Sequence, residues 1–210
     1  MGFGSWYDNT IVPKIVSCGC GMEDINELRK KVVPLASGKV FELGCGGGFN
    51  QQHYDTSKVT SFSGIDPNGA LLEGARARAV EKGWEADIRA GVGEDIPFDS
   101  ESFDTVLCTF TLCSVGEPGK VLSEMRRILR PGGQLLFLEH GRAPDPGPYK
   151  WQRRLEPVWK RLMGNCHLTR PVIANVEGSG FTVEEMGKGY QEKGPKWAGW
   201  MEWGVAHKRF

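Results

Sequence analysis

Alternating glycines after a short apolar segment give the clearest sign of ligand binding in this sequence. Glu42 lies near the end of the apolar segment, and Gly44, Gly46 and Gly48 follow it. Glycine adopts conformations with positive φ and lets a ligand approach the main chain closely. The pattern is not the dinucleotide fingerprint G-x-G-x-x-G, because residue 49 is Phe, and no Lys-Ser or Lys-Thr follows as in a phosphate-binding P-loop. We therefore expect a cofactor loop of another type.

Asp66 lies 22 residues after Gly44, where we expect the second strand to end. At this place in a doubly wound fold, a carboxylate can accept hydrogen bonds from both hydroxyls of a ribose. The alternative is a structural role in the turn Asp66-Pro67-Asn68, since aspartate and asparagine side chains bond to nearby main chain in turns. The spacing from the glycine loop favours the ribose-binding role.

The elements that would carry these residues alternate between strand and helix. Short runs rich in β-branched and aromatic residues predict strands, and apolar residues at helical spacing predict helices. Strands are expected at 39–43, 61–66, 88–92, 103–109 and 134–139, and helices at 23–33, 68–83 and 117–129. Asn68 is expected to cap the second of these helices, and Pro131-Gly132-Gly133 to stop the third. This alternation predicts βαβ units and a parallel sheet covered on both faces.

The predicted fold class is therefore α/β, a doubly wound and mostly parallel seven-stranded sheet. Two final strand-like segments, 181–186 and 202–209, flank a Gly/Pro/Trp-rich connection, which predicts a C-terminal antiparallel hairpin. The length fits one domain, 1–210, in which 1–38 form an N-terminal cap and 142–171 a basic lid-like insertion. The aromatic residues before the last strand are assigned to the core by default: Trp197, Trp200 and Trp203.

Charge and hydropathy argue against several classes of function. The 26 Lys and Arg residues balance the 26 Asp and Glu residues, so no nucleic-acid partner is expected. The longest aliphatic or aromatic run, 135–138, is far too short to span a bilayer. The first residues do not resemble a secretory signal, and a cytoplasmic location is expected.

The six cysteines are interpreted as reduced thiols. They occupy positions 18, 20, 45, 108, 113 and 166. The spacing Cys18-x-Cys20 is too tight for the usual zinc knuckle, and no second pair follows at zinc-finger distance. No metal site is expected; a site formed by Cys18, Cys20 and a distant histidine is the alternative.

Three further motifs strengthen the cofactor prediction when taken with the glycine loop. In chain order, Gly93-Glu-Asp-Ile-Pro-Phe98, Ser102-Phe-Asp104 and Leu129-Arg-Pro-Gly-Gly133 resemble those of the class I S-adenosylmethionine-dependent methyltransferases. The resemblance covers about residues 38–140 and implies S-adenosylmethionine as cofactor and S-adenosylhomocysteine as product. It also implies that the glycine loop passes under the methionine part, that Asp66 holds the ribose, and that the turn after the third strand meets the adenine.

Carried over residue by residue, the resemblance gives a set of cofactor-binding candidates. Thr109 would lie near the methionine part, and Glu42 would orient the loop or the cofactor's amino group. Tyr7 would fold back over the cofactor, the alternative being a loosely ordered terminus. For Glu94 the alternative to cofactor binding is a place in a solvated turn. The candidates are Tyr7, Glu42, Gly44, Cys45, Gly46, Gly48, Asn50, Asp66, Pro67, Asn68, Val92, Gly93, Glu94 and Thr109.

A second set of motifs points to the methyl acceptor. The segments 107–115, 137–140, 151–159 and 164–170 resemble the mammalian "methyltransferase-like" alkyl-thiol S-methyltransferases and their bacterial relatives. The first residues lack the hydrophobic anchor of the mammalian members. The resemblance implies methyl transfer to a small acceptor, most simply a thiol sulfur. Phospholipid or amine N-methylation at a membrane surface and C- or O-methylation of a quinone or phenol are the alternatives. A non-catalytic regulatory module that binds S-adenosylmethionine is a more distant one.

The segment 142–171 carries seven basic and two acidic residues, and 149–163 is amphipathic. Leu155, Val158, Trp159 and Leu162 fall at helical spacing, and Pro157 is expected to kink or restart the helix. A basic amphipathic helix with tryptophan suits a membrane surface. The interpretation we favour is a lid over the acceptor pocket with its apolar face buried. The two are compatible if the acceptor is lipophilic.

His140 is the first candidate for a catalytic base. It follows the fifth predicted strand directly, so it would lie beside the transferred methyl group. A thiol has a pKa near 8.5, so a modest base suffices to ionise it. The alternative for His140 is to order Glu139. His167 is a weaker candidate, better suited to packing within the lid.

Overall fold

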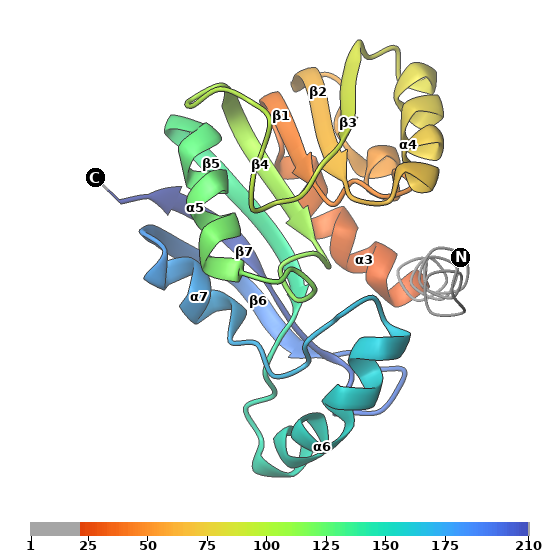
Figure 1. The fold of residues 1–210 in the computed structure, drawn as a ribbon, viewed down its shortest axis with the longest axis vertical. Helices are drawn as coiled ribbons and strands as arrows, with labels where there is room; N and C mark the ends of the chain where they lie inside the picture. Colours follow the sequence, from red (N-terminus) through yellow and green to blue (C-terminus); the bar gives the residue numbers. More distant parts are fainter. Residues whose placement is uncertain (1–21, 210) are drawn as a thin grey trace.

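The computed structural model describes residues 22–209, and its centre is one seven-stranded sheet (Figure 1). The strand order is β3-β2-β1-β4-β5-β7-β6, and β7 runs antiparallel to both of its neighbours. The strands are β1 (Gly38–Leu43), β2 (Val59–Asp66), β3 (Ala86–Ala90), β4 (Phe103–Thr109), β5 (Leu129–His140), β6 (Phe181–Tyr190) and β7 (Trp200–Lys208). The predicted doubly wound sheet with a C-terminal antiparallel hairpin is confirmed.

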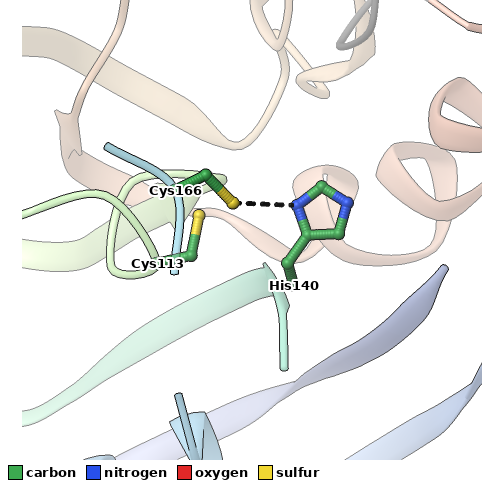
Figure 2. A group of neighbouring side chains, drawn as sticks. All are labelled: Cys113, His140 and Cys166. Carbon is green, nitrogen blue, oxygen red and sulfur yellow. Dashed lines mark hydrogen bonds between the residues drawn. The ribbon is translucent and has the colours of Figure 1, made fainter. Parts of the chain in front are cut away.

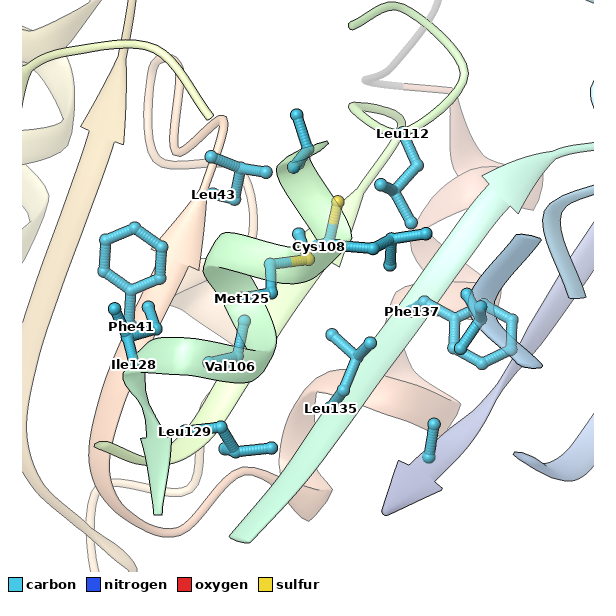
Figure 3. Close-up of a cluster of buried hydrophobic side chains, with 14 of the residues drawn as sticks. Phe41, Leu43, Val106, Cys108, Leu112, Met125, Ile128, Leu129, Leu135 and Phe137 are labelled. Carbon is cyan, nitrogen blue, oxygen red and sulfur yellow. The ribbon is translucent and has the colours of Figure 1, made fainter. Parts of the chain in front are cut away.

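Helices cover both faces of this sheet. The helices are α3 (Glu23–Val32), α4 (Gly69–Glu81), α5 (Pro118–Ile128), α6 (Pro146–Leu162) and α7 (Val172–Gly178), with short 3₁₀ turns η1 (Val33–Leu35) and η2 (Gln51–His53). Cores rich in aliphatic side chains lie under α5 and α7 on one face and under α3 and α4 on the other. The first of these cores is shown in Figure 3.

Successive side chains of the central strands point to opposite faces of the sheet and so contribute to both cores. On β5, Leu135 and Phe137 join the core under α5, whereas Leu136 and Leu138 join the opposite core. Successive side chains of a strand point to opposite faces, so a strand buried on both faces must be apolar throughout. This explains why the longest apolar run of the chain lies in the middle of the sheet.

The strand order places a ligand crevice at one edge of the sheet. β1 lies between β2 and β4, so the order reverses there, and ligands of open parallel sheets bind outside the carboxyl ends of the strands at such a point. Leu43, Asp66, Thr109 and His140 end β1, β2, β4 and β5. The topology therefore brings the glycine loop, the candidate ribose ligand and the candidate base to the same edge.

Several boundaries differ from the sequence prediction. The third strand is Ala86–Ala90 rather than 88–92, because the chain turns at Gly93 and Glu94, and Val92 forms only an isolated bridge with Asp95 across this turn. α5 ends at Ile128, and Pro131-Gly132-Gly133 lies within the early part of β5 instead of stopping the helix. The seven-residue α7 was not predicted, since so short a helix carries little periodicity. Asn68 does cap α4, accepting a hydrogen bond from the main-chain N–H of Ala70.

Candidate active site

A cleft of about 400 Å³ lies next to the glycine loop. This volume lies in the range of small-molecule sites, roughly 300–1,000 Å³. Seven of the predicted cofactor residues line it: Gly44, Asp66, Pro67, Asn68, Val92, Gly93 and Glu94. They come from the ends of β1, β2 and β3, so the topology assembles the predicted ribose and adenine positions into one cavity.

Asp66 is held in the cleft by two main-chain hydrogen bonds. Oδ2 accepts from the N–H of Gly46 at 3.0 Å, and Oδ1 accepts from the N–H of Asn68 at 2.8 Å. Burial raises the pKa of this carboxyl, and the two hydrogen bonds oppose that rise. A carboxylate has about four acceptor sites, so two are left for ligand hydroxyls.

The glycine loop has no room for side chains at two positions. Gly44 has φ +69°, and a Cβ there would overlap the side chain of Thr111. Gly48 has φ +79°, and a Cβ would lie 3.1 Å from Cα of Ala75 in α4. Both the backbone conformation and the close approach therefore require glycine. Cys45 is buried between the loop and β2, where burial raises the pKa of its thiol.

Glu42, Asn50 and Thr109 lie beneath the loop and do not line the cleft. Nδ2 of Asn50 donates to Oε1 of Glu42 and to Oγ1 of Thr109, each at 2.9 Å. The Tyr54 hydroxyl donates to Oε2 of Glu42 at 2.8 Å, and Nε of Arg29 donates to Oδ1 of Asn50 at 2.9 Å. Burial raises the pKa of Glu42 to about 7. Of the two roles expected for Glu42, this geometry supports orientation of the loop.

A second, smaller cavity of about 210 Å³ adjoins the cleft. Met163 lines both, and His140 and Trp159 line the second one, together with Ile25 of α3 and residues of the β6–β7 connection. The wall is mostly apolar. Its contact with the cleft through Met163 makes it the candidate acceptor cavity.

His140 lines the acceptor cavity itself and is linked to the cofactor cleft through Phe110. Its ring packs edge-on to Phe110, with ring centroids 5.2 Å apart, and Phe110 lines the cofactor cleft. Phe110 adopts φ +55°, a left-handed conformation that is rare for a bulky side chain and that often marks a functional site. The strained loop after β4 thus connects the predicted base to the cofactor side.

Two cysteines that the sequence analysis did not connect with His140 lie beside it. Sγ of Cys166 is 3.7 Å from Nδ1 of His140, and Cys113 completes the group (Figure 2). Burial lowers the pKa of His140, but the neighbouring Cys166 and Glu139 outweigh it, and the net direction is upward. Hydrogen bonding from Cys113 is the main cause of a strongly lowered pKa at Cys166. No local motif announces this group, because its members come from three distant segments.

The basic insertion differs from the predicted lid in two respects. α6 continues through Pro157 without restarting, since both Pro157 and Arg153, four residues earlier, are exposed, and water can satisfy the carbonyl that loses its partner. Its apolar face is buried only in part: Leu155 and Trp159 are half-buried, whereas Val158 is 59% exposed and Leu162 43%, and Trp151 on the same helix is 51% exposed. Gln152 alone among the residues of α6 is buried, and it bonds to the main chain of Gly141 and Ala143.

The cofactor cleft is not lined by His167, Trp197 or Trp200. Nδ1 of His167 lies 3.6 Å from Oε1 of Glu156, and His167 lines neither of the two cavities. Trp200 is buried, and Trp197 packs edge-on to Trp159. Tyr7, Cys18 and Cys20 lie outside the described residues. Among the residues that the structure describes, no helix has the length and apolarity needed to cross a membrane.

A family profile and the most similar curated sequences agree on one protein family. A profile described as a methyltransferase domain matches residues 41–137. The thiol S-methyltransferase TMT1B of Homo sapiens is 41% identical over 159 residues, covering 72% of this chain and 64% of that protein. The Rattus norvegicus TMT1B is 40% identical over 153 residues, covering 70% and 61%. The matches thus span less than two thirds of these relatives' own length.

Structural comparison shows the same fold. The YcgJ protein of Bacillus subtilis matches with a TM-score of 0.69 at 17% identity, covering 89% of this chain and 98% of that one. An S-adenosylmethionine-dependent methyltransferase of Mesorhizobium loti matches with a TM-score of 0.65 at 18% identity, covering 90% and 99%. Fold, loop geometry and sequence matches agree, and the chain belongs to the class I S-adenosylmethionine-dependent methyltransferases.

Proposed function

We propose that this chain transfers the methyl group of S-adenosylmethionine to the sulfur of a small, lipophilic thiol. The observation that carries the proposal is the apolar cavity bearing His140, which adjoins the cofactor cleft at Met163. An apolar wall suits a lipophilic acceptor. Because Met163 lines both cavities, an acceptor in the second one would lie next to the cofactor cleft. The identity of 40–42% to three proteins described as thiol S-methyltransferases supports sulfur as the attacked atom.

The residues of the cleft fit the cofactor. Asp66 retains acceptor sites for the ribose hydroxyls, and Gly44 leaves space that a Cβ would fill. Val92 and Glu94 also line the cleft, and they belong to the turn after the third strand, where the adenine is expected. The bound cofactor supplies an electrophilic methyl on its sulfonium, so the chain has to align the acceptor and exclude water.

The acceptor thiol must ionise before it attacks, since the thiolate is the nucleophile. His140 lies on the acceptor cavity, but its Nδ1 is directed at Cys166. The second ring nitrogen points away from the cysteines (Figure 2), so it is the atom that would take a proton from the acceptor. The general-base role of His140 stays a prediction, and the cluster around it is considered below.

A transfer assay with methyl-labelled cofactor tests the proposal. We expect label in lipophilic alkyl thiols, with little in amines, phenols or phosphatidylethanolamine. Turnover of an amine, phenol or phospholipid without turnover of any thiol would overturn the sulfur assignment. Tight cofactor binding without transfer to any member of the panel would instead support a regulatory module.

A lipid acceptor at a membrane surface is the second candidate, and the exposed stripe of α6 favours it. Trp151, Val158 and Leu162 form this stripe, and basic residues flank it. A phosphatidylethanolamine N-methyltransferase of Cereibacter sphaeroides is 36% identical over 118 residues, covering 55% of this chain and 57% of that protein. Membrane contact and a lipophilic thiol acceptor are compatible, and a location on the cytoplasmic side suits both. Membrane binding alone therefore leaves the assignment to sulfur in place, and methylation of phosphatidylethanolamine or of another amine would move it to nitrogen.

A further inference from the structure

Two cysteines and a histidine from three segments of the chain converge beside the acceptor cavity. Cys113 lies in the loop after β4, His140 ends β5, and Cys166 lies between α6 and α7. One ligand-capable atom from each residue lies within 4.8 Å of the other two, and both cysteines are buried. Figure 2 shows the two sulfur atoms and one ring nitrogen facing one another.

We propose that Cys113, His140 and Cys166 bind a thiophilic metal ion of the zinc class, with the fourth coordination position on the acceptor cavity. Zinc binds thiolate sulfur at about 2.3 Å and imidazole nitrogen at about 2.0–2.1 Å. Those lengths put neighbouring ligand atoms of a tetrahedral site roughly 3.5–3.8 Å apart. The separation of 3.7 Å between Sγ of Cys166 and Nδ1 of His140 fits this requirement. Two sulfurs and a nitrogen exclude hard cations such as Mg²⁺ and Ca²⁺, which take oxygen ligands.

Hydrogen bonds from outside the group hold its members in place. The carboxylate of Glu139 accepts the main-chain N–H of Leu112 at 2.9 Å and of Cys113 at 3.1 Å, which fixes the Cys113 loop to the end of β5. The N–H of His167 donates to the carbonyl of Cys113 at 2.8 Å, which fixes the Cys166 segment to the same loop. Metal sites depend on such outer contacts to orient their ligands.

The electrostatic surroundings also favour a cation with thiolate ligands. Both sulfur atoms are buried and lie within 4.8 Å of a ring nitrogen of His140, so a cation among them would be shielded from water. A divalent ion would ionise both thiols and leave the buried group neutral. Nε1 of Trp159 is buried next to Cys166 and makes no hydrogen bond to a nitrogen or oxygen in the described part of the chain. This indole N–H is placed to donate to a metal-bound sulfur.

The fourth position would serve the acceptor, a step that rests on the proposed function. Of the three ligands, His140 lines the acceptor cavity, together with Trp159, so the group lies at the wall of this cavity. A thiol that binds there loses its proton to solvent, and its sulfur forms the new bond to the methyl carbon. The bond from that carbon to the cofactor's sulfonium sulfur breaks, which leaves a thioether and S-adenosylhomocysteine. The ion then takes over the ionising role predicted for His140, whose imidazole becomes a ligand.

Metal analysis of the full chain tests the site. Protein produced with zinc in the medium should carry about one zinc per chain. Cys113→Ser, Cys166→Ser and His140→Ala should each lower zinc affinity by at least about tenfold. The Cys18→Ser/Cys20→Ser double variant and His167→Asn are matched controls and should keep their zinc. Cobalt substitution should give the visible absorption of tetrahedral thiolate coordination, and addition of an alkyl thiol should shift it.

The outcomes separate this site from the proposed function. Folded wild-type protein that binds neither zinc nor cobalt would overturn the site, as would zinc that survives all three ligand substitutions or is lost only with Cys18 and Cys20. Full thiol transfer by the zinc-free wild type would overturn the role in catalysis. Zinc retained by the wild type and lost in the variants, with no transfer to any thiol, would leave the site standing and contradict the proposed function. Circular dichroism shows whether each variant is folded, and the cobalt titration of wild type decides the case if all variants unfold.

Discussion

Oδ2 of Asp66 accepts a hydrogen bond from the main-chain N–H of Gly46 at 3.0 Å, which joins the end of β2 to the glycine loop. The same carboxylate accepts the N–H of Asn68 through Oδ1, and it faces the cofactor cleft. The two roles considered for Asp66 are therefore compatible: the turn contact is present, and binding of the ribose stays a prediction. The turn contact fixes the orientation in which the remaining acceptor sites can meet a ligand.

Asp66→Ala should weaken cofactor binding by at least about tenfold, since hydrogen bonds to a charged group contribute roughly 1.5–3 kcal/mol. Asp66→Asn keeps one acceptor oxygen and should lose less. Calorimetry with S-adenosylmethionine measures both variants, with Asp87→Asn as a half-buried control on β3. Unchanged affinity in a folded Asp66→Ala protein would contradict the ribose position.

Glu42 should make stability depend on pH. Its pKa is raised from 4.5 to about 7 in the folded chain, so the folded state holds the proton more tightly than the unfolded state. The resulting stabilisation is fully present below pH 4.5 and is lost as the pH rises through about 7. The size is about 3 kcal/mol, from roughly 1.4 kcal/mol per pKa unit.

Urea unfolding without cofactor between pH 4 and 8 measures this effect. Glu42→Gln lacks the titrating group, so the difference in unfolding free energy between wild type and this variant should fall as the pH rises. Glu73→Gln, exposed on α4, should run parallel to wild type. A constant difference between wild type and Glu42→Gln would show that folding does not shift the pKa of Glu42.

Glu139 should be a stability determinant of the loop after β4. Its carboxylate accepts main-chain N–H groups of Thr111, Leu112 and Cys113. In Glu139→Gln an amide nitrogen replaces one acceptor and faces a donor, which should cost about 1–3 kcal/mol of unfolding free energy. Urea unfolding compares it with the exposed Glu81→Gln, which should stay within about 0.5 kcal/mol of wild type. Equal stability of the two variants would contradict the role.

The sheet and the cofactor loop were predictable because their signals are local. The strand that carries Glu42, the glycines after it and the spacing to Asp66 all reflect neighbours in sequence, and the structure places them as expected. The network beneath the loop was predicted only in part. Asn50 and Thr109 were expected at the cofactor, and the structure shows them bonded to each other and not lining the cleft. Local pattern identifies a loop but not which of its side chains turn inward.

The cluster at His140 illustrates what sequence alone cannot give. Cys113 and Cys166 are 53 residues apart, with His140 between them, so no motif spacing links the three. They meet because β4 and β5 are neighbours in the sheet and because the chain returns past α6 to the same edge. The exposed face of α6 is a similar case, since periodicity predicts an amphipathic helix but not what covers its apolar side.

That exposed face predicts binding to anionic membranes. Trp151, Val158 and Leu162 lie at spacings of seven and four residues, which places them on one side of α6, and all are well exposed. Arg153 and Arg154 lie beside this stripe and are exposed as well. A basic amphipathic helix gains affinity from buried apolar area and from attraction to anionic lipid, about 1 kcal/mol for each basic residue near the surface.

Vesicle flotation should therefore show the protein bound to phosphatidylserine-containing vesicles and much less to phosphatidylcholine alone. Replacing Trp151, Val158 and Leu162 together by Ser should reduce binding by at least about tenfold, because burying one large apolar side chain contributes roughly 1.5–3 kcal/mol. Val80→Ser removes an apolar residue that is 74% exposed on α4 and should leave binding unchanged. Because attraction between exposed charges is screened by salt, high salt should weaken the wild-type interaction. If the wild type stays unbound even at low salt, the stripe does not contact membranes, and the lipophilic acceptor must reach the cavity from solution.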